Sequence, residues 1–467
     1  MTSLAKSTGL ETFLQGSPEI KYIPPNSPDY PAARKVFHAG RRDNPLAIVQ
    51  PQSPSDVAAL IKYAKSSSLP FTIRSGGHNL EGRAIVEGAL CIDLRALTAV
   101  TVASDRQSAT VQGGVLQGDL ANKLWAEGLA TPTGTIPSVG YVGWATYGGY
   151  GPFSSHWGLG VDQILSATIV NHDGDIIHVN ADEPLLQGIR GAGGLYGVIL
   201  DLTIKVYPLT SLLAGAIIFD SSNITKTCVD FNAAYENLLD TEGLPLELTI
   251  QQIAFNAPTG RCFGTIFVWS GVNIEEGQYW SEKIASLGPL VANTVAPANI
   301  QDWFRGNGAL VPPTAFGSSY THNISRVSPV IAETIGRGLA SMPSDPGTMV
   351  SIHQLRGPST EPQGISSSVF EAREPHYMLE LLGLTVQKDV QKESEKWAAQ
   401  MAEDIKQADP DYVLPSAYVS LYATTVQATS PAKTLEKTYG SKVEVLKALK
   451  AKFDPENVFS LAIPALK

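Results

Sequence analysis

Cysteine is rare in this sequence, and basic residues are outnumbered by acidic ones. The 467 residues include only three cysteines, Cys91, Cys228 and Cys262, which lie far apart in the chain. This spacing excludes a disulfide framework and a Cys-x-x-Cys metal site, so we expect buried structural thiols and no metal. Lysine and arginine number 34 against 44 aspartates and glutamates, which gives a net charge of -10 with no basic block. We therefore expect no nucleic-acid partner.

Long apolar runs are also missing. No stretch approaches the length of a membrane span, and residues 1–17 lack the basic segment and apolar core of a secretion signal. We therefore expect a cytoplasmic protein with no membrane partner. With 43% hydrophobic and 17% charged residues over 467 positions, the chain is long enough for two or three domain-sized units.

Two common nucleotide-binding motifs are absent, namely a Walker-type Gly-Lys-Ser/Thr loop and a Gly-x-Gly-x-x-Gly turn that opens a helix. What is present is Arg74-Ser75-Gly76-Gly77-His78. It follows a strand expected at 71–73, which follows a helix capped by Ser53, so the loop ends a βαβ-like unit where backbone N–H groups can converge on an anion. On its own, the loop fits a surface turn with a solvated histidine better than a cofactor site.

Two further glycine clusters favour the functional interpretation. Residues 134–151 contain six glycines in eighteen positions, and residues 190–198 run from Arg-Gly-Ala-Gly-Gly into a strand. Glycine weakens regular structure, so such density indicates turns or backbone packed against something planar or charged. The alternative is a loop-rich connector. Three clusters between residues 74 and 198 suit a long, extended cofactor better than a single phosphate.

The pattern of expected strands and helices changes near residue 210. Residues 44–209 are rich in short strands, expected at 47–49, 71–73, 89–94, 100–103, 109–112, 164–170, 175–179 and 198–207, with a helix at 116–125. Residues 211–415 alternate strands expected at 246–254, 262–269, 349–354 and 377–384 with helices at 224–239, 274–287 and 390–406. The second region predicts a largely antiparallel sheet with helices on one face. An amphipathic helix with outward lysines is expected within 434–459.

Taken in order, these clusters resemble a known family, the flavoproteins of the vanillyl-alcohol oxidase type, and within it the berberine-bridge-enzyme-like oxidases. Residues 74–78 resemble the family's flavin-linking loop, and 134–151 its Gly-x-Cys-Pro-x-Val-Gly segment with the glycine run that follows. Residues 158–162, 190–198 and 453–459 resemble later elements of the same family. The likeness therefore spans nearly the whole chain.

The resemblance implies an α+β, two-domain FAD-binding (PCMH-type) fold, with residues 1–209 as the FAD-binding domain, 210–425 as the substrate-binding domain, and 426–467 returning to the first. It also implies FAD bound covalently through His78, by a bond to the flavin 8α-methyl carbon. The second attachment cysteine of some members is Ile136 here, so a single covalent bond is expected. The resemblance places these residues at the cofactor: Arg74, Ser75, Gly76, Gly77, His78, Asn79, Gly134, Ile136, Ser138, Val139, Gly140, Gly143, Gly148, Gly149, Gly151, Gly158, Gly194, Gly197 and Val198.

The sequence also departs from the family pattern. Val142 and Tyr147 stand where glycines are usual, and Trp144 adds bulk, so the cleft beside the flavin is expected to be reshaped. Ser420 replaces the asparagine of a Tyr-x-Asn element. Val139 stands where members hold a small apolar residue near the oxygen-reactive carbon, which is compatible with oxygen access; the alternative is an ordinary core valine.

The reaction implied by this family needs a base to take a proton from the substrate. The candidates lie in the substrate-binding region: Tyr418, which fits the family element, then Glu380, Tyr422 and His353. Gln354 and Tyr377 are further polar residues on the expected strands. Glu380 fits an exposed carboxylate paired with Arg373 equally well, and His353 fits a satisfied core histidine. Arg373 itself fits either a substrate anchor or an interdomain brace.

By this resemblance we expect an FAD-dependent oxidase that passes a hydride from a small alcohol, amine or phenol-type substrate to the flavin and then to O2, giving hydrogen peroxide. A role in secondary metabolism fits best. The alternatives are a flavoprotein cyclase that closes a ring, and a binding protein without catalysis on the same scaffold. Small-molecule substrate and O2 are the expected partners, and the oligomeric state is left open.

Overall fold

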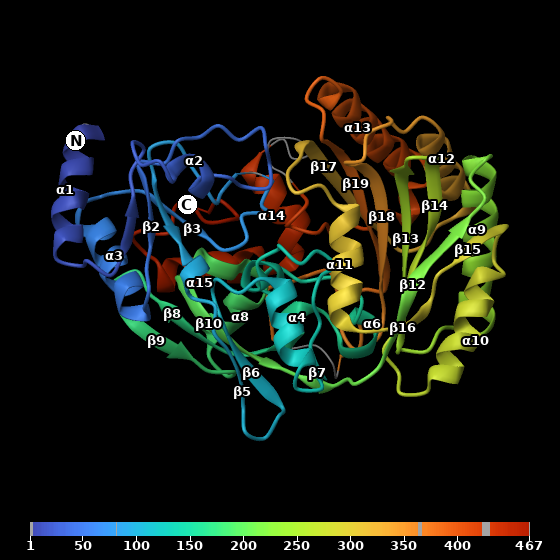
Figure 1. Ribbon diagram of the computed structural model, residues 1–467, viewed down its shortest axis with the longest axis horizontal. Coiled ribbons are helices and arrows are strands. Elements are labelled where there is room, and N and C mark those ends of the chain that lie inside the picture. The colour runs from blue at the N-terminus through green and yellow to red at the C-terminus, as the bar shows by residue number, and fades with distance from the viewer. Residues whose placement is uncertain (1–2, 81, 363–366, 423–429, 467) are drawn as a thin grey trace.

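The computed structural model describes residues 3–80, 82–362, 367–422 and 430–466. Two parts lie side by side in Figure 1. One part, coloured blue to green, contains the sheets formed by residues 21–208, and the other contains a large sheet formed by residues 212–385. The last helices, α14 (Pro431–Tyr439) and α15 (Val443–Phe453), return to the first part, where α15 packs against α8.

The first sheet positions the loop that ends in His78. Its order is β1-β2-β4-β3, and the last three strands run parallel. Helix α3 connects β2 to β3 and begins with a capping box between Ser53 and Asp56, so the predicted βαβ-like unit is confirmed. The elements are α1 (Ser3–Gln15), β1 (Lys21–Ile23), α2 (Tyr30–Ala33), β2 (Ala47–Gln50), α3 (Pro54–Ser66), β3 (Phe71–Arg74) and β4 (Leu90–Asp93).

The second sheet is antiparallel, in the order β5-β6-β10-β8-β9. Its predicted hairpin turns at Gly174, whose φ of 76° lies in the left-handed region that glycine tolerates. The strands are β5 (Val100–Val102), β6 (Ser108–Gln112), β8 (Ile164–Val170), β9 (Ile176–Val179) and β10 (Val198–Lys205). The other elements of this region are α4 (Gln117–Trp125), β7 (Leu129–Ala130), α5 (Tyr141–Thr146), α6 (Ser154–Trp157), α7 (Gly160–Gln163), α8 (Pro184–Ala192) and β11 (Tyr207–Pro208).

The third sheet has eight strands and is antiparallel, as predicted. The strands are β12 (Leu212–Phe219), β13 (Leu248–Ala257), β14 (Gly260–Trp269), β15 (Leu290–Asn293), β16 (Ala296–Ala298), β17 (Phe316–Ile324), β18 (Thr348–Leu355) and β19 (His376–Thr385). The helices are α9 (Ile224–Thr241), α10 (Ile274–Ala285), α11 (Ile300–Leu310), α12 (Pro329–Ala340) and α13 (Gln391–Ala408). The sequence did not predict β12, β17, α11 and α12.

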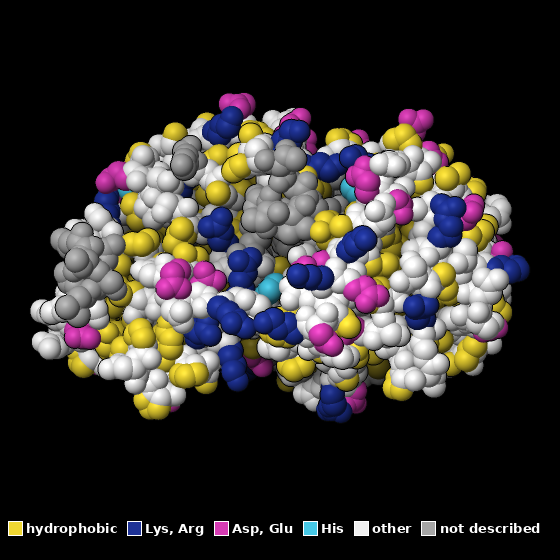
Figure 2. All heavy atoms as spheres, turned by 90° about the horizontal axis from the view of Figure 1, so that it is seen from above, with side chains coloured by type: hydrophobic (Ala, Val, Ile, Leu, Met, Phe, Trp, Pro, Cys, Tyr) yellow, Lys and Arg dark blue, Asp and Glu magenta, His cyan; other side chains and the backbone are white. Residues whose placement is uncertain are grey.

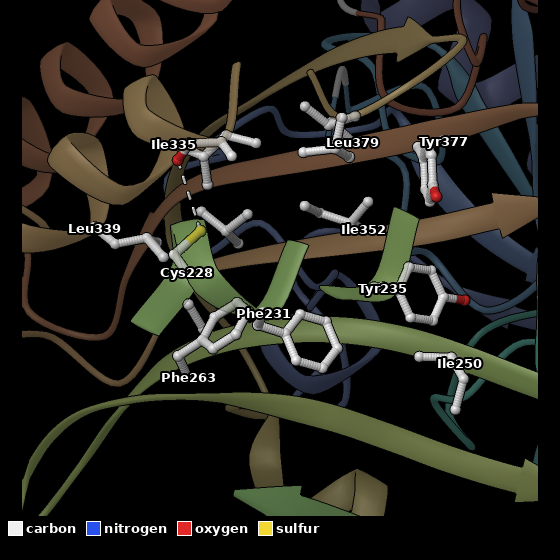
Figure 3. Packing of buried hydrophobic residues seen from close by; sticks show 14 of the residues in the cluster. Cys228, Phe231, Tyr235, Ile250, Phe263, Ile335, Leu339, Ile352, Tyr377 and Leu379 are labelled. Atoms are coloured by element: carbon white, nitrogen blue, oxygen red, sulfur yellow. Dashed lines mark hydrogen bonds between the residues drawn. The ribbon is translucent and has the colours of Figure 1, made fainter. Parts of the chain in front are cut away.

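One face of this sheet is covered by α9, α10, α12 and α13. Figure 3 shows Cys228, Phe231 and Tyr235 of α9 packed against Ile250, Ile352 and Leu379 of the strands. Every second strand residue faces these helices, as the two-residue period of a strand requires. The alternate residues, such as Gln251, His353 and Glu380, therefore lie on the opposite face of the sheet. The α+β class and the predicted cover of helices on one face are confirmed.

The C-terminal region agrees with its prediction in part. The amphipathic helix expected within 434–459 is α15, and a second helix, α14, precedes it, because the chain turns at Gly440, where φ is 44°. The expectation that the tail lysines face solvent is wrong for Lys450, which is buried. Its ammonium donates to the backbone oxygen of Leu195 and to Asp454 Oδ2 at 2.5 Å. This ion pair fixes the last turn of α15, after which the chain continues toward residue 463.

The described residues contain no helix that is both long and apolar enough to cross a membrane. In the face that Figure 2 shows, lysine and arginine side chains gather near the middle with acidic side chains beside them. The predicted division at 209/210 falls between β11 and β12 and stays a prediction. The predicted division at 425/426 lies outside the described residues. Cys91 and Cys228 are buried as expected, whereas Cys262 is partly exposed.

Candidate FAD site

A cavity of about 310 Å³ lies where the end of β3, the start of α5, the start of β10 and the C-terminal tail meet. Most of its wall comes from segments that the sequence singled out. The predicted cofactor residues that line it are Ser75, Gly76, Gly77, His78, Asn79, Val139, Gly140, Gly143, Gly194, Gly197 and Val198. The structure thus brings the three glycine clusters, which are distant in sequence, around one cavity.

The wall fits an extended polar cofactor. A Cβ atom at Gly143 or Gly194 would meet no protein atom within 4 Å, so bare backbone faces open space at both positions. The Ser75 hydroxyl is buried and has no hydrogen-bond partner among the described residues. A buried hydroxyl without a partner costs free energy, which a ligand oxygen can recover. These features match a group that lies along the backbone and accepts hydrogen bonds from it.

Direct backbone contact joins the first two clusters. A Cβ at Gly76 would lie 2.3 Å from the backbone nitrogen of Gly140, and one at Gly140 would lie 2.3 Å from Ser75 Oγ. Any larger residue at either position would push the loops apart. The glycines at 76 and 140 are therefore explained by this close approach.

His78 lies at the cavity wall between two neighbours. Its Nε2 is 2.9 Å from Ser138 Oγ, and its ring stacks on Phe37 with centroids 4.7 Å apart and planes at 18°. Burial lowers the pKa of His78 to about 4. The imidazole is consequently neutral at physiological pH and keeps a nitrogen lone pair, which is the form that acts as a nucleophile.

Arg74 does not line the cavity, so its expected role as a cation beside the cofactor needs correction. Its guanidinium is buried and donates to the backbone oxygens of Ala33 and Lys35. Burial lowers the pKa of Arg74. The side chain braces the segment before residue 37 against the His78 loop, and the sequence alone could not show which way it points.

Seven other predicted cofactor residues lie outside the cavity wall: Gly134, Ile136, Ser138, Gly148, Gly149, Gly151 and Gly158. Ser138 reaches the site through His78. For Gly148 and Gly151 the reason is packing, since a Cβ would lie 2.6 Å from the Phe370 ring and 1.7 Å from the Thr133 oxygen respectively. The glycine run after residue 147 therefore allows close packing behind the wall.

Part of the wall was missed by the sequence. Leu461, Ala462 and Ile463 of the tail line the cavity, and the Tyr147 hydroxyl donates to the Ile463 backbone oxygen at 2.6 Å. Nothing in the composition of 461–463 marks these residues. Tyr147, which stands where the family has a glycine, and the bulky Trp144 also line the cavity. Both side chains can therefore reshape it, as expected.

Tyr418 and Ser420 belong to the same wall, on the side of the eight-stranded sheet. Tyr418 is buried and packs edge-on against Tyr150 at 5.0 Å between centroids. Burial raises the pKa of Tyr418 to about 12, against the opposing effect of hydrogen bonds to the Ser420 side chain and the Gly149 backbone. Ser420 thus bonds to Tyr418 although it replaces the family asparagine.

Glu380 and His353 form a pair on adjacent strands, on the sheet face opposite the helices. Glu380 Oε2 is 3.3 Å from His353 Nε2, which is also 3.1 Å from Ser351 Oγ. The charge of Glu380 contributes to the raised pKa of Tyr418, so the carboxylate lies near the phenol. Neither Glu380 nor His353 lines the cavity itself. The contacts with Ser351 and Glu380 agree with the interpretation of His353 as a satisfied histidine.

Three other polar candidates are not at the site. Tyr377 donates to Glu236 Oε1 at 2.8 Å and Gln354 accepts from the Tyr235 hydroxyl at 2.8 Å, so both face the helices. Tyr422 follows Tyr418 in a turn and does not line the cavity. The period of two along β18 and β19 separates Gln354 and Tyr377 from His353 and Glu380.

Arg373 does not pair with Glu380, so that alternative is wrong. Its guanidinium donates to both carboxylate oxygens of Asp162, at 2.7 and 3.0 Å, and Ser359 also donates to Asp162. Asp162 is 3% exposed, so this charge pair is largely removed from water. Arg373 therefore braces the loop before β19 against α7, in agreement with the interdomain role.

Comparison with known proteins identifies the cofactor. Residues 45–180 match the model of the FAD binding domain. The chain is 28% identical to the FAD-linked oxidoreductase aurO of Gibberella zeae, over 97% of this chain and 87% of that protein. It is 35% identical to (R)-6-hydroxynicotine oxidase of Paenarthrobacter nicotinovorans, over 45% of this chain and 46% of that protein.

The fold agrees with these relatives. The crystal structure of 6-hydroxy-D-nicotine oxidase from Arthrobacter nicotinovorans superposes with a TM-score of 0.83 at 23% identity, covering 96% of this chain and 97% of that one. A histidine-to-alanine variant of berberine bridge enzyme superposes with a TM-score of 0.82 at 18% identity, covering 98% of this chain and 100% of that one. The fold is thus that of the vanillyl-alcohol oxidase type, with its PCMH-type FAD-binding domain.

The fold and the cavity define a flavoprotein. The FAD binding domain, the fold and the similarity to FAD-linked oxidoreductases confirm the predicted fold, FAD as the cofactor and the enzyme class, an FAD-dependent oxidoreductase.

Proposed function

We propose that this protein is an oxidase with FAD attached covalently through His78, acting on a small organic substrate and passing electrons to O2. The observation that carries the proposal is the placement of a neutral, stacked imidazole at the wall of a glycine-lined cavity, with Tyr418 on the same wall. Bound FAD supplies the chemistry of hydride acceptance at N5 and reoxidation by O2, which gives hydrogen peroxide.

Different residues of the cavity would bind different parts of FAD. The backbone of 75–79 and the free Ser75 hydroxyl would hold the polar part of the cofactor, and Gly143 and Gly194 would let it lie against the backbone. His78 would provide the covalent bond. Ile136 offers no thiol for a second bond, so attachment is single.

We assign the proton acceptor to Glu380 and a hydrogen-bonding role to Tyr418. A phenol with a pKa near 12 keeps its proton at neutral pH, so Tyr418 can donate to a substrate oxygen or nitrogen but is a weak base. The carboxylate group of Glu380, hydrogen-bonded to His353, offers oxygen acceptors near the phenol. This order reverses the expectation from the sequence, which put Tyr418 first.

The substrate is a small molecule, as in the relatives. The names of relatives include hydroxynicotine oxidase and chitooligosaccharide oxidase, so the same fold handles amines and sugars. The aromatic and apolar side chains that line the cavity together with Tyr418, namely Tyr147, Trp144 and Val139, favour a compact apolar or aromatic substrate with one oxidisable polar group. A secondary metabolite meets this description.

The proposal is tested by oxygen consumption on a panel of alcohols, amines and phenols. For the substrate that reduces the flavin, we expect one hydrogen peroxide per product under air. A turnover that forms product without consuming oxygen would instead identify a redox-neutral cyclase, and a purified protein without flavin absorbance would identify a binding protein.

A further inference from the structure

The His78 loop and the 138–140 loop behave as one unit because their backbones touch. The hypothetical Cβ atoms at Gly76 and Gly140 would lie 2.3 Å from atoms of the opposite loop. Their relative position is therefore fixed by contact. A side chain on the second loop can in consequence be placed accurately against one on the first.

Ser138 supplies such a side chain. Its hydroxyl lies 2.9 Å from His78 Nε2, across the loop contact, and Ser138 does not line the cavity. Ser138 is exposed. The hydroxyl is thus placed to act on the cofactor through the imidazole.

Phe37 holds the same ring from its face. The rings stack at 4.7 Å and 18°. Phe37 is itself anchored on both sides, because its N–H donates to the Gly77 oxygen at 3.0 Å and its oxygen accepts from the Ala315 N–H at 3.0 Å. With the plane set by Phe37 and one nitrogen bonded to Ser138, the imidazole has little freedom left to rotate.

The bond also stabilises one tautomer of the ring when Nε2–H is its donor. A neutral imidazole carries a proton on one nitrogen and a lone pair on the other. When Nε2–H donates to Ser138 Oγ, the lone pair is on Nδ1, for which the structure records no hydrogen bond among the described residues. Without the hydroxyl, His78 would populate both tautomers and more ring orientations. A smaller fraction of the protein molecules would then hold His78 in the form that attacks the cofactor.

We propose that Ser138 is a positioning residue for flavin attachment, which holds His78 in the tautomer and orientation that bond to the cofactor. This inference rests on the proposed covalent link. In the attachment step Nδ1 bonds to the 8α-methyl carbon, which loses a hydrogen, and the Nε2 proton leaves toward Ser138 and solvent. The two electrons released pass through the flavin to O2, which takes up two protons and becomes hydrogen peroxide.

The test is the rate at which apoprotein attaches added FAD, read as flavin fluorescence of acid-precipitated protein at several FAD concentrations. For Ser138→Ala we expect the rate at saturating FAD to fall about tenfold, the effect of losing one hydrogen bond, with the half-saturating FAD concentration unchanged. Ser138→Thr keeps the hydroxyl and should restore the rate to within about twofold of wild type.

Ser75→Ala is the matched comparison, since this serine lies in the same loop contact, lines the cavity and has a hydroxyl without a hydrogen-bond partner among the described residues. It should raise the half-saturating FAD concentration and leave the saturated rate close to that of wild type. The inference is wrong if Ser138→Ala attaches FAD at the wild-type rate, or if it weakens reversible binding as much as it slows attachment. A wild-type protein that attaches no FAD would refute the proposed covalent link itself.

Discussion

The two regions that form the site differ in how far they rely on backbone and on side chains. In the region of residues 71–198, the cavity wall includes bare backbone, made accessible by glycines such as Gly143 and Gly194. In the eight-stranded sheet, the site is made of side chains, Glu380 and His353 on neighbouring strands with Tyr418 beside them. The first region binds the cofactor by its shape and charge, and the second supplies the side chains that react with the substrate.

This difference explains how one fold serves many reactions. Backbone contacts to FAD survive most changes of side chain but not the addition of a Cβ. Glu380 and His353 can change without disturbing the core beneath the helices, because that core lies on the other face of the sheet. Mutations should therefore separate the two regions cleanly.

The largest effect is expected from Glu380→Gln, which removes the proton acceptor and keeps the shape. Flavin reduction by substrate should slow by about 10²- to 10⁴-fold, the usual contribution of a general base, while the flavin content stays that of wild type. Tyr418→Phe should cost about tenfold, since it loses a hydrogen bond only. Stopped-flow reduction without oxygen measures both. If the rate of flavin reduction falls more in Tyr418→Phe than in Glu380→Gln, Tyr418 is the base.

The reverse separation is expected from Gly194→Leu, whose side chain would project into open cavity space. FAD binding should weaken at least about 100-fold, because a side chain occupies the place of the cofactor. The thermal midpoint of the apoprotein should change little. Gly306→Leu on α11, where a Cβ also meets nothing within 4 Å, is the control and should bind FAD normally. Equal FAD binding by both variants would contradict the assignment of the cavity.

The tail supports the cofactor region through Lys450. Lys450→Met leaves Asp454 buried without its cation, and we expect a loss of about 3–5 kcal/mol in the free energy of unfolding. Lys447→Met removes the exposed partner of Glu444 and should cost less than about 0.5 kcal/mol. Urea unfolding of the two variants gives the comparison. Equal costs would show that the α15 ion pair does not hold the tail.

A smaller effect, in pH dependence, is expected where the two regions meet at His376. His376 is bonded to the Tyr150 hydroxyl and the Glu374 oxygen, and burial lowers its pKa to about 4. Between the unfolded pKa of about 6.5 and pH 4, the unfolded chain binds more protons, so stability falls as the pH is lowered through this range. His376→Gln should reduce that slope. A slope equal to that of wild type in urea unfolding from pH 7 to 4.5 would contradict the assignment.

The sequence predicted the cofactor region better than the substrate region, for a physical reason. The backbone approach at Gly76 and Gly140 leaves a local mark in the sequence, because only glycine fits. The pairing of Glu380 with His353 depends on strand register across residues distant in sequence, and the direction of Arg74 depends on contacts with residues 33 and 35. Such long-range geometry leaves no local mark. The period of two could, however, have separated Tyr377 from Glu380.

The central claim is that His78 carries the flavin, and peptide mass spectrometry of the purified protein tests it most directly. We predict that acid-precipitated wild-type protein stays yellow and that the peptide containing His78 carries the whole flavin adduct. His78→Ala should bind FAD only reversibly and lose its colour on precipitation. Colourless wild-type precipitate, or an adduct on a peptide without His78, would contradict the account.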